Sequence, residues 1–507
     1  MSKVDEVGSP RVTSVRVAVI GAGFSGVGAA IALTNAGIHD YVVLEKAAEV
    51  GGTWRENTYP GCGCDVFSSL YSYSFAPNPN WSRAFARQPE ILAYLRDVAE
   101  RYGVTERVRF ETVVRGATWS ETTQTWTVET STGIVEAQAV IAAAGPLHEP
   151  KIPDLPGLDT FAGTTFHSAE WNHDHDLTGR RVAVVGTGAS AIQFVPEIVD
   201  RVASLTLFQR TAPWVLPKPD HPVPAIESGL FRRVPAAQRA FRSALYHGLE
   251  LLQLGQRHPR VMAQIQRIGL ANLRLQVRDP QLRAALTPEF TLGCKRILLS
   301  NTYYRALTRP HVDVVPRGVR EVRERSVIDA DGVEHEVDTI IFGTGFHVTD
   351  PPIASMVRGR DGRTLAEVWQ GSPQAYLGTT VSGFPNAFIT IGPNLGNGHS
   401  SAIVLVEAQL RYIVGALKAM DRDGIASIDV RKGVQSSYNS EVQAALAGTV
   451  WNAGGCSSYY LDANGRNSAI YPWSTIDLRR RTRRFTLAAY ETRAVDAVVE
   501  SLPAAVG

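Results

Sequence analysis

The chain has 507 residues, of which 44% are apolar and 20% charged, so we expect an ordinary globular protein of about two to four domains. Its formal charge of +2 gives no reason to expect nucleic acid or a membrane surface as a partner. The polar first 16 residues and the absence of an apolar run of roughly 18 residues predict neither a signal peptide nor a transmembrane segment.

The four cysteines contain no CxxC pair, which argues against a dithiol redox motif and against a thiolate zinc site. We expect no metal. So few cysteines in a long chain are typical of a reducing cytoplasm, which is the location that the sequence predicts.

The first informative motif follows a β-branched run over residues 15–20. It is a GxGxxG sequence with glycines at Gly21, Gly23 and Gly26. A helix is predicted from Val27 to about residue 36, and a strand over residues 41–44 ends at Glu45. This order is typical of a dinucleotide site, where the glycines allow a tight turn and a close approach of pyrophosphate. The acid at the end of the second strand is suited to a ribose.

The same pattern recurs after the strand predicted at 182–185, as the GxGxxA variant Gly186, Thr187, Gly188, Ala189, Ser190 and Ala191. Here the next strand, over residues 204–208, ends at Gln209 and Arg210 instead of an acid. Arg210 lies 19 residues beyond Ala191, the offset that also separates Glu45 from Gly26. An arginine at this position is suited to a ribose 2′-phosphate, so the second motif predicts NADP and the first predicts FAD.

Two such motifs predict an α/β protein with two Rossmann-like domains that pass a hydride from NADPH to FAD. A Pro-rich connector after residue 145 marks a boundary. We therefore expect an FAD-binding domain in 1–150, an NADP-binding domain in 151–345, and in 346–507 a return to the FAD domain with a C-terminal cap. Residues 224–288 have helical spacing and predict a helical insertion. A covering layer is the simplest interpretation of this insertion, with a lid or a membrane-leaning surface as alternatives.

Three motifs identify a family. Residues 161–171 fit FxGxxxHxxxW through Phe161, Gly163, His167 and Trp171, and residues 52–65 fit GxWxxxxYPGxxxD. The third is Cys294-Lys295-Arg296, followed by Asn-Thr-Tyr-Tyr at 301–304. In these motifs the chain resembles the Baeyer–Villiger monooxygenases, from about residue 15 to 485. It departs from the family pattern at Asn172, where Pro or Asp is usual, and at Tyr459, where we would expect a Trp.

The resemblance implies that one oxygen atom of dioxygen is inserted into a ketone to give an ester or lactone, through a flavin peroxide. It implies that Arg296 is the active-site arginine with Asp65 beside it, and that His167 and Trp171 lie in an interdomain linker that couples domain movement. The FAD contacts it implies are Ser25, Glu45, Thr53, Trp54, Asp65 and Tyr71. The NADPH contacts it implies are the turn from Thr187 to Gln193, together with Arg210, Thr211, Lys295 and Arg296.

The chemistry explains why an arginine and a carboxylate would be needed. A guanidinium is permanently charged and stabilises both a peroxide anion and the oxyanion that forms on the ketone. A carboxylate at Asp65 would hold that guanidinium in place. Oxygenation of sulfur or nitrogen, a flavin reductase or oxidase without oxygen insertion, and a silent redox-sensing flavoprotein remain open alternatives. The sequence names neither the ketone nor the oligomeric state.

Overall fold

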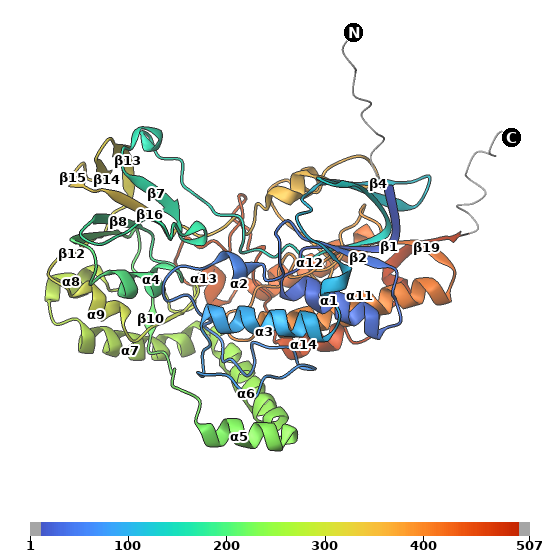
Figure 1. Cartoon of the computed structure of the whole chain (residues 1–507), viewed down its shortest axis with the longest axis horizontal. Coiled ribbons are helices and arrows are strands. Elements are labelled where there is room, and N and C mark those ends of the chain that lie inside the picture. The colour runs from blue at the N-terminus through green and yellow to red at the C-terminus, as the bar shows by residue number, and fades with distance from the viewer. Residues whose placement is uncertain (1–11, 496–507) are drawn as a thin grey trace, which may run out of the picture.

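The computed structural model describes residues 12–495. Its core consists of two largely parallel sheets with helices packed on their faces, which is the α/β class that the sequence predicts (Figure 1). The first sheet has the order β17-β4-β5-β6-β1-β2-β3, with β18 added beside β6. Its strands are β1 (Val12–Ile20), β2 (Tyr41–Leu44), β3 (Val108–Arg109), β4 (Val114–Ser120), β5 (Thr125–Thr130), β6 (Gly133–Ala142), β17 (Val357–Arg358) and β18 (Ala387–Ile389).

The second sheet is parallel throughout and has the order β12-β9-β8-β16-β7. Its strands are β7 (Thr164–His167), β8 (Arg181–Val185), β9 (Ser204–Phe208), β12 (Val312–Val315) and β16 (Thr339–Phe342). The edge strand β7 corrects one expectation, because His167 ends a strand of this sheet and does not lie in a free linker. The strand satisfies the backbone of residues 164–167, which a linker would leave to water.

The two nucleotide motifs have the same local geometry. Gly21 and Gly186 have φ of +100° and +105°, a region that favours glycine. A Cβ on Gly21 would lie 2.8 Å from the carbonyl oxygen of Ala143, and one on Gly186 would lie 2.5 Å from that of Gly343. Ala143 follows β6 and Gly343 follows β16, so each turn packs against the end of a neighbouring strand. The helices α1 (Phe24–Asn35) and α4 (Ala191–Ile198) follow these turns.

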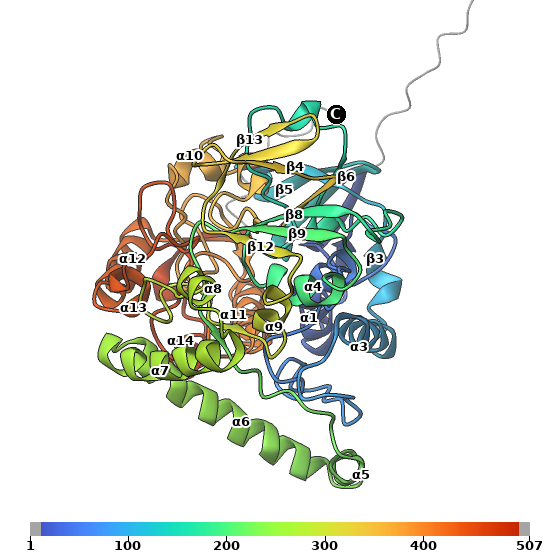
Figure 2. The same cartoon turned by 90° about the vertical axis from the view of Figure 1, so that its left-hand side faces the viewer.

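A group of helices separates β9 from β12 in the sequence. It comprises α5 (Ala225–Arg233), α6 (Pro235–Gln256), α7 (Pro259–Gln276) and α8 (Pro280–Ala285). Figure 2 shows α5, α6 and α7 along the lower side of the molecule, with α5 farthest from the two sheets. None of the helices within residues 12–495 is long and apolar enough to cross a membrane.

The remaining elements are smaller sheets and helices around the two main sheets. Three smaller sheets are formed by β10 (Val215–Leu216) with β11 (Leu298–Leu299), by β13 (Val319–Arg323), β14 (Ser326–Asp329) and β15 (Glu334–Glu336), and by β19 (Ile425–Val430) with β20 (Tyr490–Ala494). The other helices are α2 (Thr53–Glu56), α3 (Gln88–Arg101), α9 (Tyr303–Leu307), α10 (Leu365–Trp369), α11 (Ala402–Arg422), α12 (Lys432–Leu446), α13 (Val450–Ala453) and α14 (Thr475–Arg481). Helix α11 packs on α1, which returns the C-terminal part of the chain to the first sheet.

Candidate active site

A cavity of about 1530 Å³ is lined by residues of both sheets and of the C-terminal part. This volume exceeds the roughly 300–1,000 Å³ of an ordinary small-molecule site, as two dinucleotides and a substrate require. The cavity is lined by most of the site residues that the sequence predicts: Thr53, Trp54, Asp65, Tyr71, Gly186, Thr187, Gly188, Ser190, Gln193, Arg210, Thr211, Lys295 and Arg296.

The other predicted residues do not line it: Gly21, Gly23, Ser25, Gly26, Glu45, Ala191, Phe161, Gly163, His167 and Trp171. Gly52 packs on the first turn, with 3.1 Å between the Cα of Gly23 and the position of a Cβ on Gly52. Glu45 is 4% exposed, and its carboxylate accepts hydrogen bonds from the Ala22 amide at 2.7 Å and from Arg55 at 3.1 Å. Its contact with a ribose stays a prediction.

Two cations and a hydroxyl meet where β9 ends. The Lys295 ammonium donates a hydrogen bond to the Thr211 hydroxyl at 2.9 Å and lies 5.1 Å from the centre of the Phe290 ring. Burial, together with the nearby charge of Arg210, lowers the pKa of Lys295. Neither Arg210 nor Lys295 forms an ion pair with any residue in the described part of the chain. This uncompensated charge is suited to a phosphate dianion.

Arg296 and Asp65 are neighbours. The guanidinium Nη2 lies 3.5 Å from a carboxylate oxygen of Asp65, whose side chain is 7% exposed. Burial lowers the pKa of Arg296, but the Asp65 carboxylate and the nearby Tyr459 and Tyr460 together raise it, and the net direction is upward. Two further groups face this carboxylate: Lys218 Nζ at 3.9 Å, which the sequence analysis did not single out, and the amide of Gln193 at 3.4 Å, which it expected to contact NADPH. The site therefore keeps a permanent positive charge.

Gln193 joins the two halves of the molecule. Its side-chain oxygen accepts hydrogen bonds from the Tyr59 hydroxyl at 3.1 Å and from the Gly63 amide at 3.2 Å. Its amide nitrogen donates to the Gly63 carbonyl at 3.1 Å. Because α4 carries Gln193 and the GxWxxxxYPGxxxD motif contains Tyr59 and Gly63, the second nucleotide turn is held directly against the first half.

Residues of the FxGxxxHxxxW motif pack against the side chains that form this junction. Trp171 packs on Phe194 of α4, with 5.3 Å between the ring centres, and Phe194 packs on Tyr59 at 6.2 Å. The His167 ring is fully buried, accepts a hydrogen bond from the Ala169 amide at 3.1 Å and packs edge-on against Phe346. Burial lowers the pKa of His167 to about 4, so its ring is neutral at pH 7.

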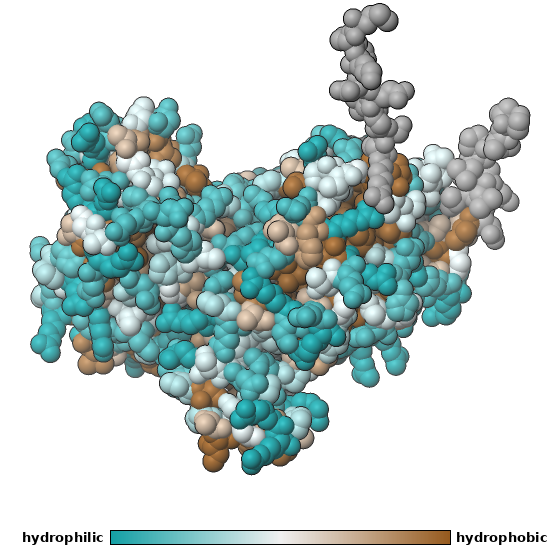
Figure 3. Space-filling view, viewed as in Figure 1, coloured by the Kyte–Doolittle hydropathy of each residue, from teal (hydrophilic) through white to brown (hydrophobic). Residues whose placement is uncertain are grey.

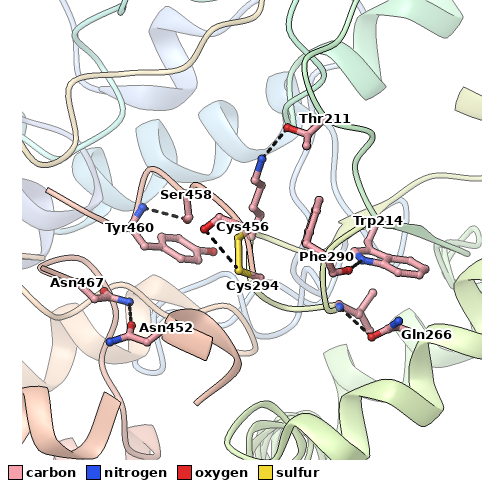
Figure 4. Close-up of a disulfide and its surroundings, with 12 residues drawn as sticks. Thr211, Trp214, Gln266, Phe290, Cys294, Asn452, Cys456, Ser458, Tyr460 and Asn467 are labelled. Atoms are coloured by element: carbon pink, nitrogen blue, oxygen red, sulfur yellow. Dashed lines mark hydrogen bonds between the residues drawn. A yellow bond between two sulfur atoms is a disulfide. The ribbon is translucent and has the colours of Figure 1, made fainter. Parts of the chain in front are cut away.

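A disulfide joins Cys294 to Cys456, with their Cα atoms 6.1 Å apart (Figure 4). It ties the segment that carries Lys295 and Arg296 to the C-terminal segment whose Tyr459 and Tyr460 line the cavity. The sequence did not predict this disulfide, because the motifs considered there join closely spaced cysteines and 162 residues separate these two. The bond removes the support that cysteine usage gave to a cytoplasmic location, which stays a prediction.

The two free cysteines have no exposed thiol. Cys62 and Cys64 are buried, and burial raises the pKa of each thiol to about 12. Within residues 12–495 no group of three His, Cys, Asp or Glu side chains is arranged to hold a metal ion.

Comparison with known proteins identifies the family. Residues 18–238 match the family model described as pyridine nucleotide-disulphide oxidoreductase. The chain is 50% identical to a Baeyer–Villiger monooxygenase of Streptomyces coelicolor over 97% of this chain and 94% of that protein. The chain belongs to the Baeyer–Villiger monooxygenases. A second Baeyer–Villiger monooxygenase, from Pseudomonas aeruginosa, is 48% identical over 94% of this chain and 91% of that protein.

Solved structures of other monooxygenases have the same fold. A closed cyclohexanone monooxygenase matches 96% of this chain and all of that chain, with a TM-score of 0.84 and 28% identity. An oxidised steroid monooxygenase bound to NADP matches 95% of this chain and all of that chain, with a TM-score of 0.83 and 29% identity. As a Baeyer–Villiger monooxygenase, this chain is an enzyme that uses FAD and NADPH to oxygenate ketones, which confirms the function that the motifs predict.

Proposed function

We propose that Arg296 and Asp65 carry out the ketone oxygenation of this Baeyer–Villiger monooxygenase, and that the ketone is an apolar molecule. The observation that supports the roles of these residues is the Arg296–Asp65 pair, at 3.5 Å, in the wall of a cavity that both halves line. The apolar ketone is inferred from side chains such as Met262, Ile265 and Phe290, which line the same cavity. FAD and NADPH, when bound, supply the hydride transfer and the reduction of dioxygen.

In this proposal the residues of the chain bind and orient the reactants. Arg296 stabilises the negative charge that develops on the ketone oxygen, and Asp65 holds the guanidinium in place. Arg210, Thr211 and Lys295 would bind the 2′-phosphate of NADPH, and the turn from Thr187 to Gln193 would hold the rest of this cofactor. FAD binds along the first half, where the Trp54 indole donates a hydrogen bond to the Tyr71 hydroxyl at 3.0 Å.

We also propose the domain division expected from the sequence: 1–150 for the first part of the FAD-binding domain, 151–345 for the NADP-binding domain, and 346–507 for the return and cap. The sheet strands support it, because β1 to β6 precede residue 150 and β7 to β16 lie between 151 and 345. The strands β17 and β18, from the C-terminal part, rejoin the first sheet. Residues 1–11 and 496–507 lie outside the described part.

The test is Arg296→Ala in the FAD-loaded enzyme. A panel of linear, cyclic and aromatic ketones, with one sulfide, is incubated with NADPH, and products are identified by mass. We expect ester formation to fall by about 10²–10³ while NADPH still reduces the flavin, because the loss of one electrostatic contact costs about that much. Arg296→Lys should rescue little, since an ammonium lacks the planar fork.

The matched control is Arg181→Ala. Arg181 is held by Asp338 at 2.8 Å and does not line the cavity. Ester formation at a near-normal rate by Arg296→Ala would overturn the assignment. Turnover of the sulfide alone would overturn the choice of a ketone.

A further inference from the structure

We propose that the outer face of α7, together with α5 and the start of α6, docks on the surface of an anionic phospholipid bilayer. We call this the α5–α7 surface. It is formed by the exposed apolar and arginine side chains of residues 226–278, described below. The inference goes beyond the proposed function, because it concerns where the enzyme lies and not what it catalyses.

The charge of the molecule is unevenly distributed. Residues 224–288 contain ten arginines, no lysine and three acidic residues, a charge of +7 in a chain whose total is +2. The overall balance, from which we expected no membrane partner, hides this separation. Seven of the ten arginines are exposed: Arg232, Arg233, Arg239, Arg260, Arg267, Arg274 and Arg278. No ion pair to an acid is formed by any of the ten within residues 12–495.

Helix α7 presents apolar side chains to solvent at a regular spacing. Val261, Ile268 and Leu275 are 45%, 56% and 81% exposed. They are seven residues apart, a spacing that drifts by only about 20° per step around a helix, so they form one stripe. An arginine precedes each of them, which makes a second stripe of Arg260, Arg267 and Arg274. The side of α7 next to this stripe faces the protein, with Met262 and Ile265 lining the cavity and Gly269 packed on Trp214.

The tip formed by α5 and the start of α6 has the same composition. Ile226 is 83% exposed, and Leu230, Val234 and Phe241 are each more than 40% exposed. Arg232, Arg233 and Arg239 are exposed on the same short stretch of chain. Figure 3 shows apolar side chains at the lower end of this projection, below the rest of the molecule.

An anionic bilayer fits these observations. Helices that lie in a membrane interface combine exposed apolar side chains with arginines, and each arginine near an anionic leaflet adds to the affinity. A second copy of the chain would place two surfaces of the same charge against each other. Leu275 and Ile226 are 81% and 83% exposed within groups of exposed apolar side chains, and contiguous apolar patches rimmed by polar residues mark interaction sites. Docking would place the cavity wall formed by α7 next to the lipid.

The test is cosedimentation of the full-length FAD-loaded enzyme with large unilamellar vesicles. One set is phosphatidylcholine with about one third phosphatidylglycerol, and the other is phosphatidylcholine alone. We expect binding to the anionic vesicles that weakens with added salt. The variant Arg260→Gln/Arg267→Gln/Arg274→Gln should bind at least tenfold more weakly. Ile268→Ser/Leu275→Ser should also lose binding.

The matched control is Arg115→Gln/Arg325→Gln/Arg411→Gln, which removes the same charge from exposed positions outside the α5–α7 surface. It should bind vesicles like the unmodified enzyme. Turnover without vesicles, measured for every variant, shows that each is folded. Failure of the unmodified enzyme to sediment with anionic vesicles would overturn the proposal. An equal loss in the control would do so too, as would binding to polyglutamate in the absence of vesicle binding.

Discussion

The Lys295 ammonium and the Thr211 hydroxyl lie 2.9 Å apart, although 84 residues separate them in the sequence. This contact joins the Cys-Lys-Arg segment to the end of the second nucleotide strand. It also places Lys295 next to Arg210, whose charge contributes to the lowered pKa of the lysine. A dianion bound here would relieve the repulsion between the two cations, which a cofactor without a 2′-phosphate cannot do.

We therefore predict a strong preference for NADPH over NADH. Hydrogen bonds to charged groups contribute about 1.5–3 kcal/mol each, so the ratio of kcat/KM values should be on the order of tens to hundreds. Arg210→Ala and Lys295→Ala should each lower kcat/KM for NADPH by about tenfold or more. The value for NADH serves as the internal control and should change little. Equal use of both cofactors by the unmodified enzyme would contradict this prediction.

Asp65→Asn should uncouple NADPH consumption from ester formation. The substitution leaves Arg296 and Lys218 without their shared counterion and frees the guanidinium to move. We expect the rate of ester formation to fall by about 10–100-fold, because misplacement of a catalytic group by 1 Å costs that much. The measurement is ester formed per NADPH consumed, with hydrogen peroxide assayed alongside. Asp329→Asn is the control, since that carboxylate is also buried and paired but does not line the cavity. An unchanged ratio in Asp65→Asn would argue against a positioning role.

His167 should make the stability of the folded chain fall in mild acid. Its pKa is lowered by burial to about 4, below the usual value near 6.5, so the unfolded chain binds a proton that the folded chain excludes. The stability from this residue is complete above about pH 6.5 and is lost as the pH falls towards 4, by at most about 3 kcal/mol. His167→Asn, which keeps an acceptor for the Ala169 amide, should flatten the melting temperature between pH 6.5 and 4.5. Parallel curves for the two proteins would show that His167 does not contribute.

Reduction of the Cys294–Cys456 disulfide should destabilise the enzyme. Closing a loop of 162 residues restricts the unfolded chain by roughly 5 kcal/mol, which for a protein of this size corresponds to about 5 °C in melting temperature. The measurement is thermal unfolding with and without dithiothreitol. Cys294→Ser/Cys456→Ser should melt at the temperature of the reduced enzyme, and dithiothreitol should not change its melting temperature. A thiol titration in denaturant should find two thiols before reduction and four after it. Four thiols at the outset would contradict the bond.

The sequence could predict local features well and distant contacts only through family resemblance. The strands Tyr41–Leu44 and Ser204–Phe208 have the predicted ends, because a glycine turn and an end residue define each nucleotide unit. Arg296 and Asp65 are 231 residues apart in the sequence, so no motif with a fixed residue spacing could predict their contact. Lys218 was missed because it lies outside every motif, and the role of Gln193 at the junction depends on how the two halves meet. The formal charge is silent on the arginine-rich helices, since a sum over the chain removes all information on where the arginines lie.

Helix α7 contributes to the cavity wall and to the exposed outer face through residues that are adjacent in the sequence. Met262 faces the cavity while its neighbour Val261 faces solvent, and Gly269 packs on Trp214 while Ile268 is exposed. Substitutions at Met262 and Ile265 should alter which ketones fit and leave the outer face as it is. Substitutions at Val261, Ile268 and Leu275 should alter the partitioning of the enzyme between water and lipid without reshaping the cavity. A directed-evolution library can therefore vary substrate range and partitioning independently within this single 18-residue helix.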